Sequence, residues 1–276
     1  MQSISFENVS HFIPEQTFDC GQCFRFELLD GGGAEGVVGK SHVTIKLSGS
    51  DLLIDGDCDR DFWEKYLMLD TDYDEVISDI GKHFGVYNNT IFEAMKVSDG
   101  IRILRQDPWE TLCSFIISQN NNIGRIKKIV ARVCEKFGEP FSSGGKTYYS
   151  FPTAQALDDA GTDEIFSCGT GFRAKYLSDA AQKYLSGDVD FDRVRTGTDE
   201  QAAAELMKIC GVGPKVAACT LLFGFGRTAS FPIDVWIRRV LEKYYSGGID
   251  LSALGSYAGI AQQYLFYYER YINGGK

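Results

Sequence analysis

The chain contains 276 residues, of which 44% are hydrophobic and 13% aromatic, so it can bury a substantial core and should form one to three domains. No basic segment leads into an apolar stretch near the first residue, and no run of about eighteen apolar residues is free of charge; the sequence therefore predicts a soluble, intracellular protein. The net charge of −10 opposes binding to nucleic acid, but residues 1–100 carry 7 basic and 19 acidic side chains and residues 101–276 carry 21 and 19, so any phosphate-binding surface belongs to the later part.

The first predicted element is an antiparallel β-sheet. Residues 22–55 alternate apolar and polar side chains in short runs that are separated by glycine-rich breaks. Two acidic stretches, at 55–61 and 70–75, then flank an aromatic segment long enough for two helical turns, and we interpret them as solvated connections. Asp70, Asp72 and Asp74 have the opening spacing of a calcium loop, but Glu75 stands where that loop requires glycine and Gly81 where it requires a carboxylate, which excludes an EF-hand.

From about Phe92 the hydrophobic period becomes helical. Five helical patterns follow, at residues 103–119, 122–138, 156–168, 174–187 and 199–210. The polar run 120–122 predicts a turn, and Thr198 with Gln201 predicts a capping box. The expected fold is therefore α+β, with an antiparallel sheet domain and flanking helices at 1–95 and a helical domain at 96–276.

The eight cysteines predict reduced thiols, since most stand inside apolar, helix-like patterns. Cys20 and Cys23 form a CxxC pair, but no second pair lies at zinc spacing and no cysteine follows Cys219. We therefore expect no metal site built from these thiols.

The segment 206–226, LMKICGVGPKVAACTLLFGFG, predicts a helix, a tight hairpin and a second helix. Gly211 and Gly213 are expected to take positive φ, and Pro214 suits the first helical position. Backbone N–H groups at such a turn can hold a phosphate without a cationic side chain. Lys215 falls in the first turn, where the helix dipole opposes an ammonium, so it has nucleophilic potential, although a lone lysine there is more often a surface residue.

Asp234 lies 19 residues after Lys215, at the position of a helix N-cap in the segment FPIDVWIRR. A cap alone would explain it. The glycine-rich hairpin, the lysine and the aspartate together, however, resemble the helix-hairpin-helix and aspartate motif of DNA glycosylases, which we place at 199–225 and 226–240. Four segments in order, CGQCFRF at 20–26, SQNNNIGRI at 118–126, GFRAKYL at 171–177 and GVGPKVAAC at 211–219, resemble the 8-oxoguanine DNA glycosylase family.

The resemblance implies a reaction and a pocket. Breaking a glycosidic bond needs a nucleophile and a fixed negative charge at the sugar, which Lys215 and Asp234 would supply. The resemblance implies that the damaged base is held by the residues corresponding to Gly21, Cys219, Gln262 and Phe266.

The resemblance also implies contacts with the rest of the duplex. The base opposite the lesion would be held by Asn120, Arg125 and Arg173, with Phe172 as the wedge that fills the gap. Backbone phosphates would be held at Gly211, Gly213 and Trp236. Trp236 stands where eukaryotic relatives carry a phosphate-binding histidine, which leaves its role open. The carbonyls of Met207, Ile209 and Val212 could hold a structural cation, but the chemistry requires no cofactor.

We therefore expect a monomeric enzyme of the prokaryotic type, in a nucleoid-associated cytoplasmic location. It would excise 8-oxoguanine opposite cytosine from double-stranded DNA and cleave the resulting abasic site, with no membrane partner. The alternatives are a bifunctional glycosylase for another oxidised base, an adenine-removing relative, or a non-catalytic helix-hairpin-helix DNA-binding protein. The first two usually carry a C-terminal cysteine cluster for iron and sulfur, which this sequence lacks.

Overall fold

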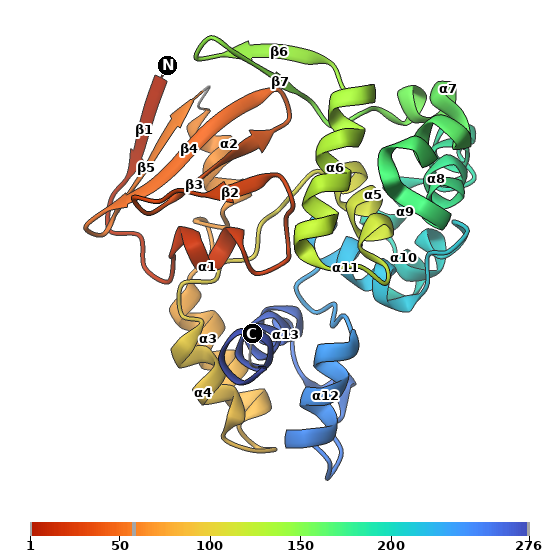
Figure 1. Cartoon of the computed structure of the whole chain (residues 1–276). Coiled ribbons are helices and arrows are strands. Elements are labelled where there is room, and N and C mark those ends of the chain that lie inside the picture. Colours follow the sequence, from red (N-terminus) through yellow and green to blue (C-terminus); the bar gives the residue numbers. More distant parts are fainter. Residues whose placement is uncertain (1, 57–58, 275–276) are drawn as a thin grey trace.

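The computed structural model describes residues 2–56 and 59–274, and they form an α+β fold (Figure 1). The N-terminal part is a five-stranded antiparallel sheet in the order β1-β5-β4-β3-β2. Its strands are β1 (Gln2–Phe6), β2 (Phe26–Leu28), β3 (Ala34–Val38), β4 (Ser41–Ser48) and β5 (Asp51–Gly56). The predicted antiparallel sheet is confirmed, but it begins earlier than residue 22, because β1 pairs with β5 at the edge of the sheet.

Alternation along the strands gives the sheet one buried face. In β5, Leu52 and Ile54 are buried while Leu53 between them is exposed. Two helices, α1 (Pro14–Phe18) and α2 (Arg60–Tyr66), cover the buried face with Phe18 and Trp63. The sheet domain therefore has a small aromatic core of its own.

The remaining helices form two further bodies. The larger contains α5 (Pro108–Ser118), α6 (Ile123–Phe137), α7 (Ala154–Ile165), α8 (Ala174–Ser186), α9 (Phe191–Thr196), α10 (Asp199–Leu206) and α11 (Pro214–Phe225). The smaller contains α3 (Tyr73–Phe84), α4 (Thr90–Val97), α12 (Val235–Tyr244) and α13 (Ala258–Tyr267), followed by the π-helical turn η4 (Tyr268–Asn273). Because α4 packs against α13, the end of the chain lies beside its first third (Figure 1).

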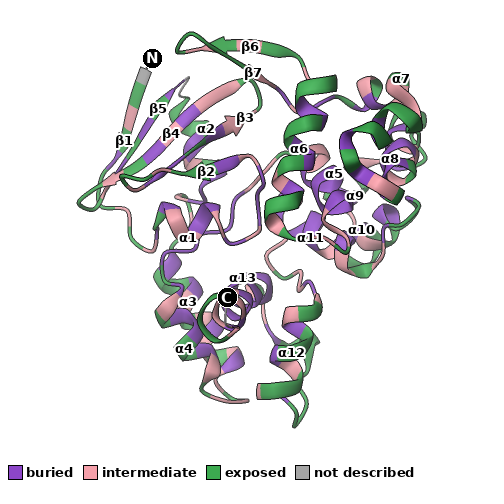
Figure 2. Ribbon diagram, in the orientation of Figure 1, coloured by how far each residue is buried: buried purple, intermediate pink, exposed green. Residues whose placement is uncertain are grey.

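Figure 2 shows that α5, α11 and α13 consist largely of buried residues, whereas the outward faces of α6 and α12 are exposed. Between α6 and α7 lies a small exposed hairpin, β6 (Pro140–Ser143) and β7 (Lys146–Tyr149), that the sequence did not predict. Four exposed or half-buried residues per strand are too few to give a clear alternating pattern.

The predicted helix at 103–119 is wrong in its first part. Residues 101–107 are in neither a helix nor a strand, and α5 begins only at Pro108. Proline lacks the N–H that a helix interior needs, so it fits only in the first turn, and the Asp107 side chain caps that turn through the N–H of Glu110.

The cysteines of the described residues are free thiols, as predicted, and all of them except Cys210 are buried. Cys58 lies outside the described residues. Within the same residues, no His, Cys, Asp or Glu side chains form a group of three that could hold a metal ion. None of the described helices is long and apolar enough to cross a membrane.

Candidate active site

The predicted helix-hairpin-helix is present as α10, a turn at residues 207–213, and α11. Thr198 and Gln201 form both hydrogen bonds of the predicted capping box. Gly211 takes φ +78, and a Cβ there would collide with the ring of Tyr176. The prediction of positive φ is wrong for Gly213, which is extended at φ −102 and serves as the N-cap of α11, with open space where a Cβ would stand.

The backbone N–H groups of Gly211 and Gly213 donate to no partner among the described residues. The turn is closed instead by the Val212 N–H, which donates to the Ile209 carbonyl, and is fixed to α8 by the Cys210 N–H, which donates to Asp179. The hairpin therefore holds a rigid shape and leaves two donors available to an anion.

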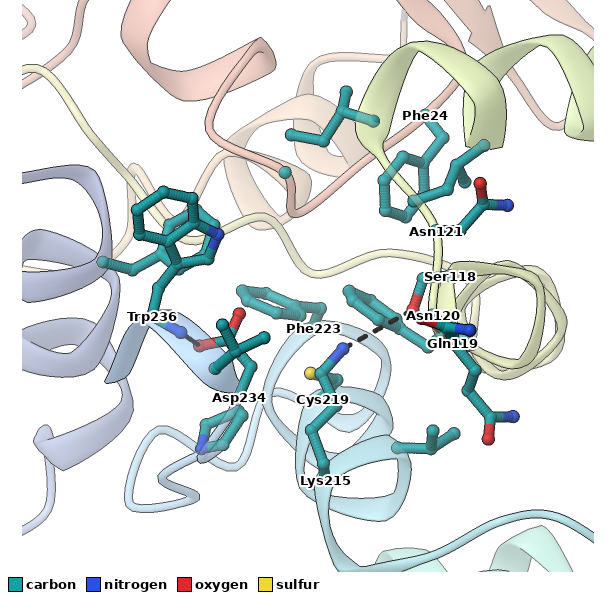
Figure 3. Close-up of a pocket in the computed structure, with 18 of the residues that line it drawn as sticks. Phe24, Ser118, Gln119, Asn120, Asn121, Lys215, Cys219, Phe223, Asp234 and Trp236 are labelled. Atoms are coloured by element: carbon teal, nitrogen blue, oxygen red, sulfur yellow. Dashed lines mark hydrogen bonds between the residues drawn. The ribbon is translucent and has the colours of Figure 1, made fainter. Parts of the chain in front are cut away.

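A cavity of about 630 Å³ opens beside the N-terminus of α11 (Figure 3). Segments far apart in the chain enclose it: the loop after α1, the end of α5, the Asp234 loop and α13. The structure brings most of the predicted site residues to its wall, namely Gly21, Asn120, Phe172, Gly213, Lys215, Cys219, Asp234, Trp236, Gln262 and Phe266. Arg125, Arg173 and Gly211 do not line it.

Lys215 extends from the first turn of α11 into this cavity. Its Nζ lies 3.5 Å from the Ser118 hydroxyl and 4.9 Å from the centre of the Phe115 ring. No carboxylate of the described residues lies within 4.0 Å of it, so the amine is not held in an ion pair. An unpaired amine in a partly apolar setting is available to attack an electrophile.

Asp234 is the N-cap of α12, as predicted. Its Oδ1 accepts the N–H groups of Trp236 and Ile237, both at 2.9 Å. The second carboxylate oxygen accepts no hydrogen bond from a described residue. Figure 3 shows the Asp234 and Lys215 side chains at the same end of the cavity, with the Cys219 sulfur beside the lysine.

Cys219 contributes a neutral sulfur to the wall. Burial raises the pKa of this thiol; the charge of Lys215 acts to lower it and that of Asp234 to raise it. The net direction is upward, so the residue is a thiol rather than a thiolate near neutral pH and presents an apolar surface.

Gln262 and Phe266 face the cavity from α13. The Gln262 side chain is buried, and its Oε1 has no hydrogen-bond partner. A buried amide oxygen without a partner is costly, so its presence at a cavity wall points to a ligand donor.

Gly21 lies opposite, at φ +84 in the loop between α1 and β2. A Cβ there would stand 3.1 Å from Ile123 Cδ1 and 3.8 Å from Phe266 Cε1. The residue belongs to no strand. The loop therefore requires glycine both for its backbone conformation and for its close approach to the pocket.

Two glutamines that sequence reasoning missed hold this loop. The buried Gln22 side chain donates to the carbonyls of Thr17 and Arg102 and accepts the N–H of Leu104, each at 2.9 Å. The Gln263 amide donates to the Cys20 carbonyl at 2.8 Å. Their only sequence signal is a polar residue inside an otherwise apolar stretch, and partners this distant in the chain cannot be read from it.

Arg173 lies beneath the turn at residues 119–122. Its guanidinium donates to the carbonyls of Gln119, Asn120 and Thr170, and only 3% of the residue is exposed. Asn120 lines the cavity at φ +48, so Arg173 fixes a strained turn. Arg125 is exposed at the start of α6, and Phe172 is 48% exposed at the cavity rim, below the guanidinium of Arg173.

Other residues of the wall carried no predicted role. They include Ser118, Phe115, Phe223, Gln263 and Arg270. Ser118 belongs to a segment that was singled out, but the apolar residues and Arg270 stand in ordinary amphipathic patterns that do not distinguish a cavity wall from a core or a surface.

Two family models together cover most of the chain. The model described as the N-terminal domain of 8-oxoguanine DNA glycosylase matches residues 5–112. The model described as the HhH-GPD superfamily of base excision DNA repair proteins matches residues 113–250.

Individual proteins resemble the chain over different lengths. The structure of MBOgg1, in complex with a low-affinity DNA ligand, matches with a TM-score of 0.92 and 38% identity, over 99% of this chain and 97% of that one. The 8-oxoguanine glycosylase/lyase of Clostridium acetobutylicum, in complex with DNA containing cytosine opposite 8-oxoguanine, matches with a TM-score of 0.90 and 35% identity, over 98% and 96%. The N-glycosylase/DNA lyase of Saccharomyces cerevisiae is 33% identical over 69% of this chain, and the match spans about half (54%) of the yeast protein.

Proposed function

Because this chain belongs to the 8-oxoguanine DNA glycosylase family, within the HhH-GPD superfamily, we propose that it excises 8-oxoguanine from double-stranded DNA and cleaves the abasic site that remains. The observation that carries the proposal is one cavity that joins the unpaired amine of Lys215, the Asp234 carboxylate and the unpartnered oxygen of Gln262. Its volume of about 630 Å³ suits a flipped nucleoside.

Excision breaks the bond between C1′ of the sugar and the base nitrogen while positive charge develops on the sugar. The Asp234 carboxylate stabilises that charge. Lys215, as a neutral amine, attacks C1′, and the base leaves with the bonding electrons and gains a proton. Opening of the sugar ring then gives an imine between Lys215 and C1′, which acidifies C2′; loss of a C2′ proton expels the 3′ phosphate by β-elimination.

The damaged base is recognised by packing against its two faces and by hydrogen bonds to its edges. Cys219 and Phe266 pack against its faces, which suits an apolar thiol and an aromatic ring. The free oxygen of Gln262 accepts a donor from its Watson–Crick edge. 8-Oxoguanine carries a hydrogen at N7 where guanine has a lone pair, and the Gly21 carbonyl accepts that hydrogen, so guanine would leave this acceptor unpaired.

The base opposite the lesion is proposed to be cytosine. Asn120 reaches it from the cavity rim with Arg125 nearby, and Phe172 fills the gap left by the flipped nucleotide. Arg173 contributes to cytosine recognition in one of two ways. It supports the turn that carries Asn120, or its guanidinium leaves the carbonyls of that turn and contacts the cytosine when DNA binds.

The free N–H groups of Gly211 and Gly213 bind a backbone phosphate, and no cofactor is needed for the reaction. A cation at the carbonyls of Met207, Ile209 and Val212 remains part of the proposal only as a structural aid. The enzyme would act on the chromosome of a prokaryotic cell.

Borohydride trapping tests the reaction class, because it reduces the imine to a stable protein–DNA adduct. With a duplex carrying 8-oxoguanine opposite cytosine, the native protein should form the adduct and Lys215→Gln should not. Lys82→Gln, which changes an exposed lysine of α3, should trap like the native protein. Failure of the native protein to form an adduct would contradict the mechanism. Stronger trapping on a duplex with thymine glycol would mean that the substrate is an oxidised pyrimidine rather than 8-oxoguanine.

The same duplex separates the roles of Lys215 and Asp234. In Asp234→Asn the amide oxygen still caps α12, so folding and binding should be retained. Excision should slow by about two to three orders of magnitude, because the negative charge beside the sugar is lost. Single-turnover excision rates measure this, and an unchanged rate would remove Asp234 from the catalytic step.

A further inference from the structure

Arg270 is a cation of the cavity wall that the proposed reaction does not use. It belongs to η4, and its guanidinium lies 5.6 Å from the centre of the Phe266 ring and 5.2 Å from that of Tyr271. No carboxylate of the described residues lies within 4.0 Å of it. By contrast, Arg195 and Arg227 in the larger helical body are paired with aspartates.

The residues on both sides of Arg270 are fixed. Glu269 is buried and accepts the Tyr244 hydroxyl at 2.9 Å, with the Lys243 ammonium at 3.4 Å, which ties η4 to α12. Tyr271 donates its hydroxyl to the Asp19 carbonyl at 2.7 Å, next to the loop that carries Gly21. Glu269 therefore faces α12 while Arg270 faces the cavity. The backbone of Arg270 is fixed before any ligand binds.

A second arginine, Arg239, lies against Trp236 of the cavity wall. The guanidinium of Arg239 lies 4.8 Å from the centre of the Trp236 ring, and it too has no carboxylate within 4.0 Å among the described residues. The indole packs against the end of η4, since a Cβ on Gly274 would lie 2.9 Å from Trp236 Cζ3 and 3.0 Å from the Arg270 carbonyl. The indole thus lies between the guanidinium of Arg239 and the backbone at the end of η4, the element that carries Arg270.

The position relative to Asp234 indicates the ligand. Trp236 is two residues from Asp234, which lies beside the sugar in the proposed reaction. When a base enters the cavity, its sugar stays at the mouth and the phosphodiesters on either side must pass along the rim. An arginine whose backbone is fixed and whose guanidinium has no carboxylate partner is suited to a phosphate, which it can bind with two parallel hydrogen bonds.

We propose that Arg270 binds a phosphate that flanks the extruded nucleotide, with Trp236 and Arg239 supporting the same contact. The inference rests on the proposed function, because it assumes that a nucleotide enters this cavity. Arg270 is here a positioning residue: it fixes the sugar over Lys215 and takes no part in bond breaking.

Equilibrium binding to a duplex with a tetrahydrofuran abasic-site analogue tests the contact, because this ligand has neither a base nor a reaction. Arg270→Gln should weaken binding about tenfold or more, and the slope of log K against log salt should fall by about 0.9, the value for one phosphate contact. Arg270→Lys keeps the positive charge but loses the two parallel donors, so its affinity should lie between those of the native protein and Arg270→Gln. Lys46→Gln, which removes an exposed charge from β4 away from the cavity, should leave both quantities unchanged. Melting temperatures verify folding.

Methylphosphonate substitution locates the phosphate. Replacing each flanking phosphate in turn by the neutral analogue should weaken the native protein at one position, and Arg270→Gln should have lost sensitivity at that position only. Equal sensitivity of both proteins at every position would overturn the proposal. The proposal would also be overturned if Arg270→Gln weakened binding of an 8-oxoguanine duplex in the Lys215→Gln background but did not weaken binding of the abasic analogue. Arg270 would then contact the base rather than a phosphate.

The two proposals fail in different ways. A native protein that forms no borohydride adduct would overturn the proposed function whatever Arg270 does. A native protein that forms the adduct, together with an Arg270→Gln variant that shows no methylphosphonate coupling, would overturn this inference alone.

Discussion

Gln262 and Gln263 are adjacent residues of α13 with opposite hydrogen-bonding situations. The Gln262 oxygen is buried at the cavity wall without a partner, whereas the Gln263 amide donates to the Cys20 carbonyl and so supports the pocket loop from behind. One side chain is therefore kept at a cost in stability, and the other contributes to stability. This contrast identifies Gln262 as the residue that awaits a ligand.

Methionine substitutions at the two positions separate these roles. Gln262→Met keeps the length of the side chain and removes the unpaired oxygen, so the free energy of unfolding should stay level or rise by about 1 kcal/mol while excision of 8-oxoguanine slows. Gln263→Met leaves the Cys20 carbonyl unpaired and should cost about 1–2 kcal/mol. Urea unfolding measures both. A destabilised Gln262→Met protein would mean that this side chain is structural.

At the scale of elements, the hairpin between α10 and α11 depends on one glycine for its fold and leaves another free. Gly211 is in the left-handed region and packs under the Tyr176 ring, which fixes the turn against α8. Gly213 is extended and faces open space. The second glycine is therefore not required by backbone geometry, and its small size suits close approach of a ligand.

Alanine substitutions test this difference. Gly211→Ala should cost well over 1 kcal/mol, because a left-handed alanine is strained and its methyl group would collide with Tyr176. Gly213→Ala should unfold at the same urea concentration as the native protein and bind the abasic analogue more weakly, because the methyl group hinders the phosphate at the hairpin. Equal stability of both variants would contradict the conformation described for Gly211.

Elements were predictable where local chemistry decides them. The sheet, the hairpin, the Thr198 capping box and the Asp234 cap follow from patterns within a few residues. The non-helical segment before Pro108 was wrongly predicted as helix, because the side chain of Gln22, far away in the chain, supplies hydrogen bonds that hold it. The packing of α4 on α13 was not predictable for the same reason: two amphipathic helices do not indicate which partner each will find.

The residues of the site were likewise predictable only where their local sequence is distinctive. The sequence places Lys215 and Asp234 at helix starts, and those positions are confirmed, but their roles were inferred from the resemblance to DNA glycosylases. Arg173 gave no sequence sign that it would be buried under the turn of Asn120, and Arg270 gave none that it would lie at the cavity wall. Side chains of one type differ only in their three-dimensional surroundings, which a linear pattern does not contain.

At the scale of the whole molecule, the sheet domain is joined to the smaller helical body by His11. The residue follows β1 at φ +52, and its ring nitrogens face Asp99 at 2.5 Å and Asp74 at 3.0 Å. Both nitrogens thus meet acceptors, an arrangement that only the doubly protonated ring satisfies. Burial acts to lower the pKa of His11, but the hydrogen bonds and charges of the two aspartates outweigh it and the pKa is raised.

This contact predicts that the joint weakens as pH rises. A raised pKa in the folded state contributes stability that is complete below the unfolded value of about 6.5 and is lost as pH passes through the folded value. His11→Gln should therefore lose most free energy of unfolding, relative to the native protein, near about pH 5.5 and less near about pH 8.5, as measured by urea unfolding. In an Asp99→Asn background the pH dependence of that difference should shrink. A difference that is constant with pH would mean that His11 joins the two bodies by packing on Tyr73 rather than by its charge.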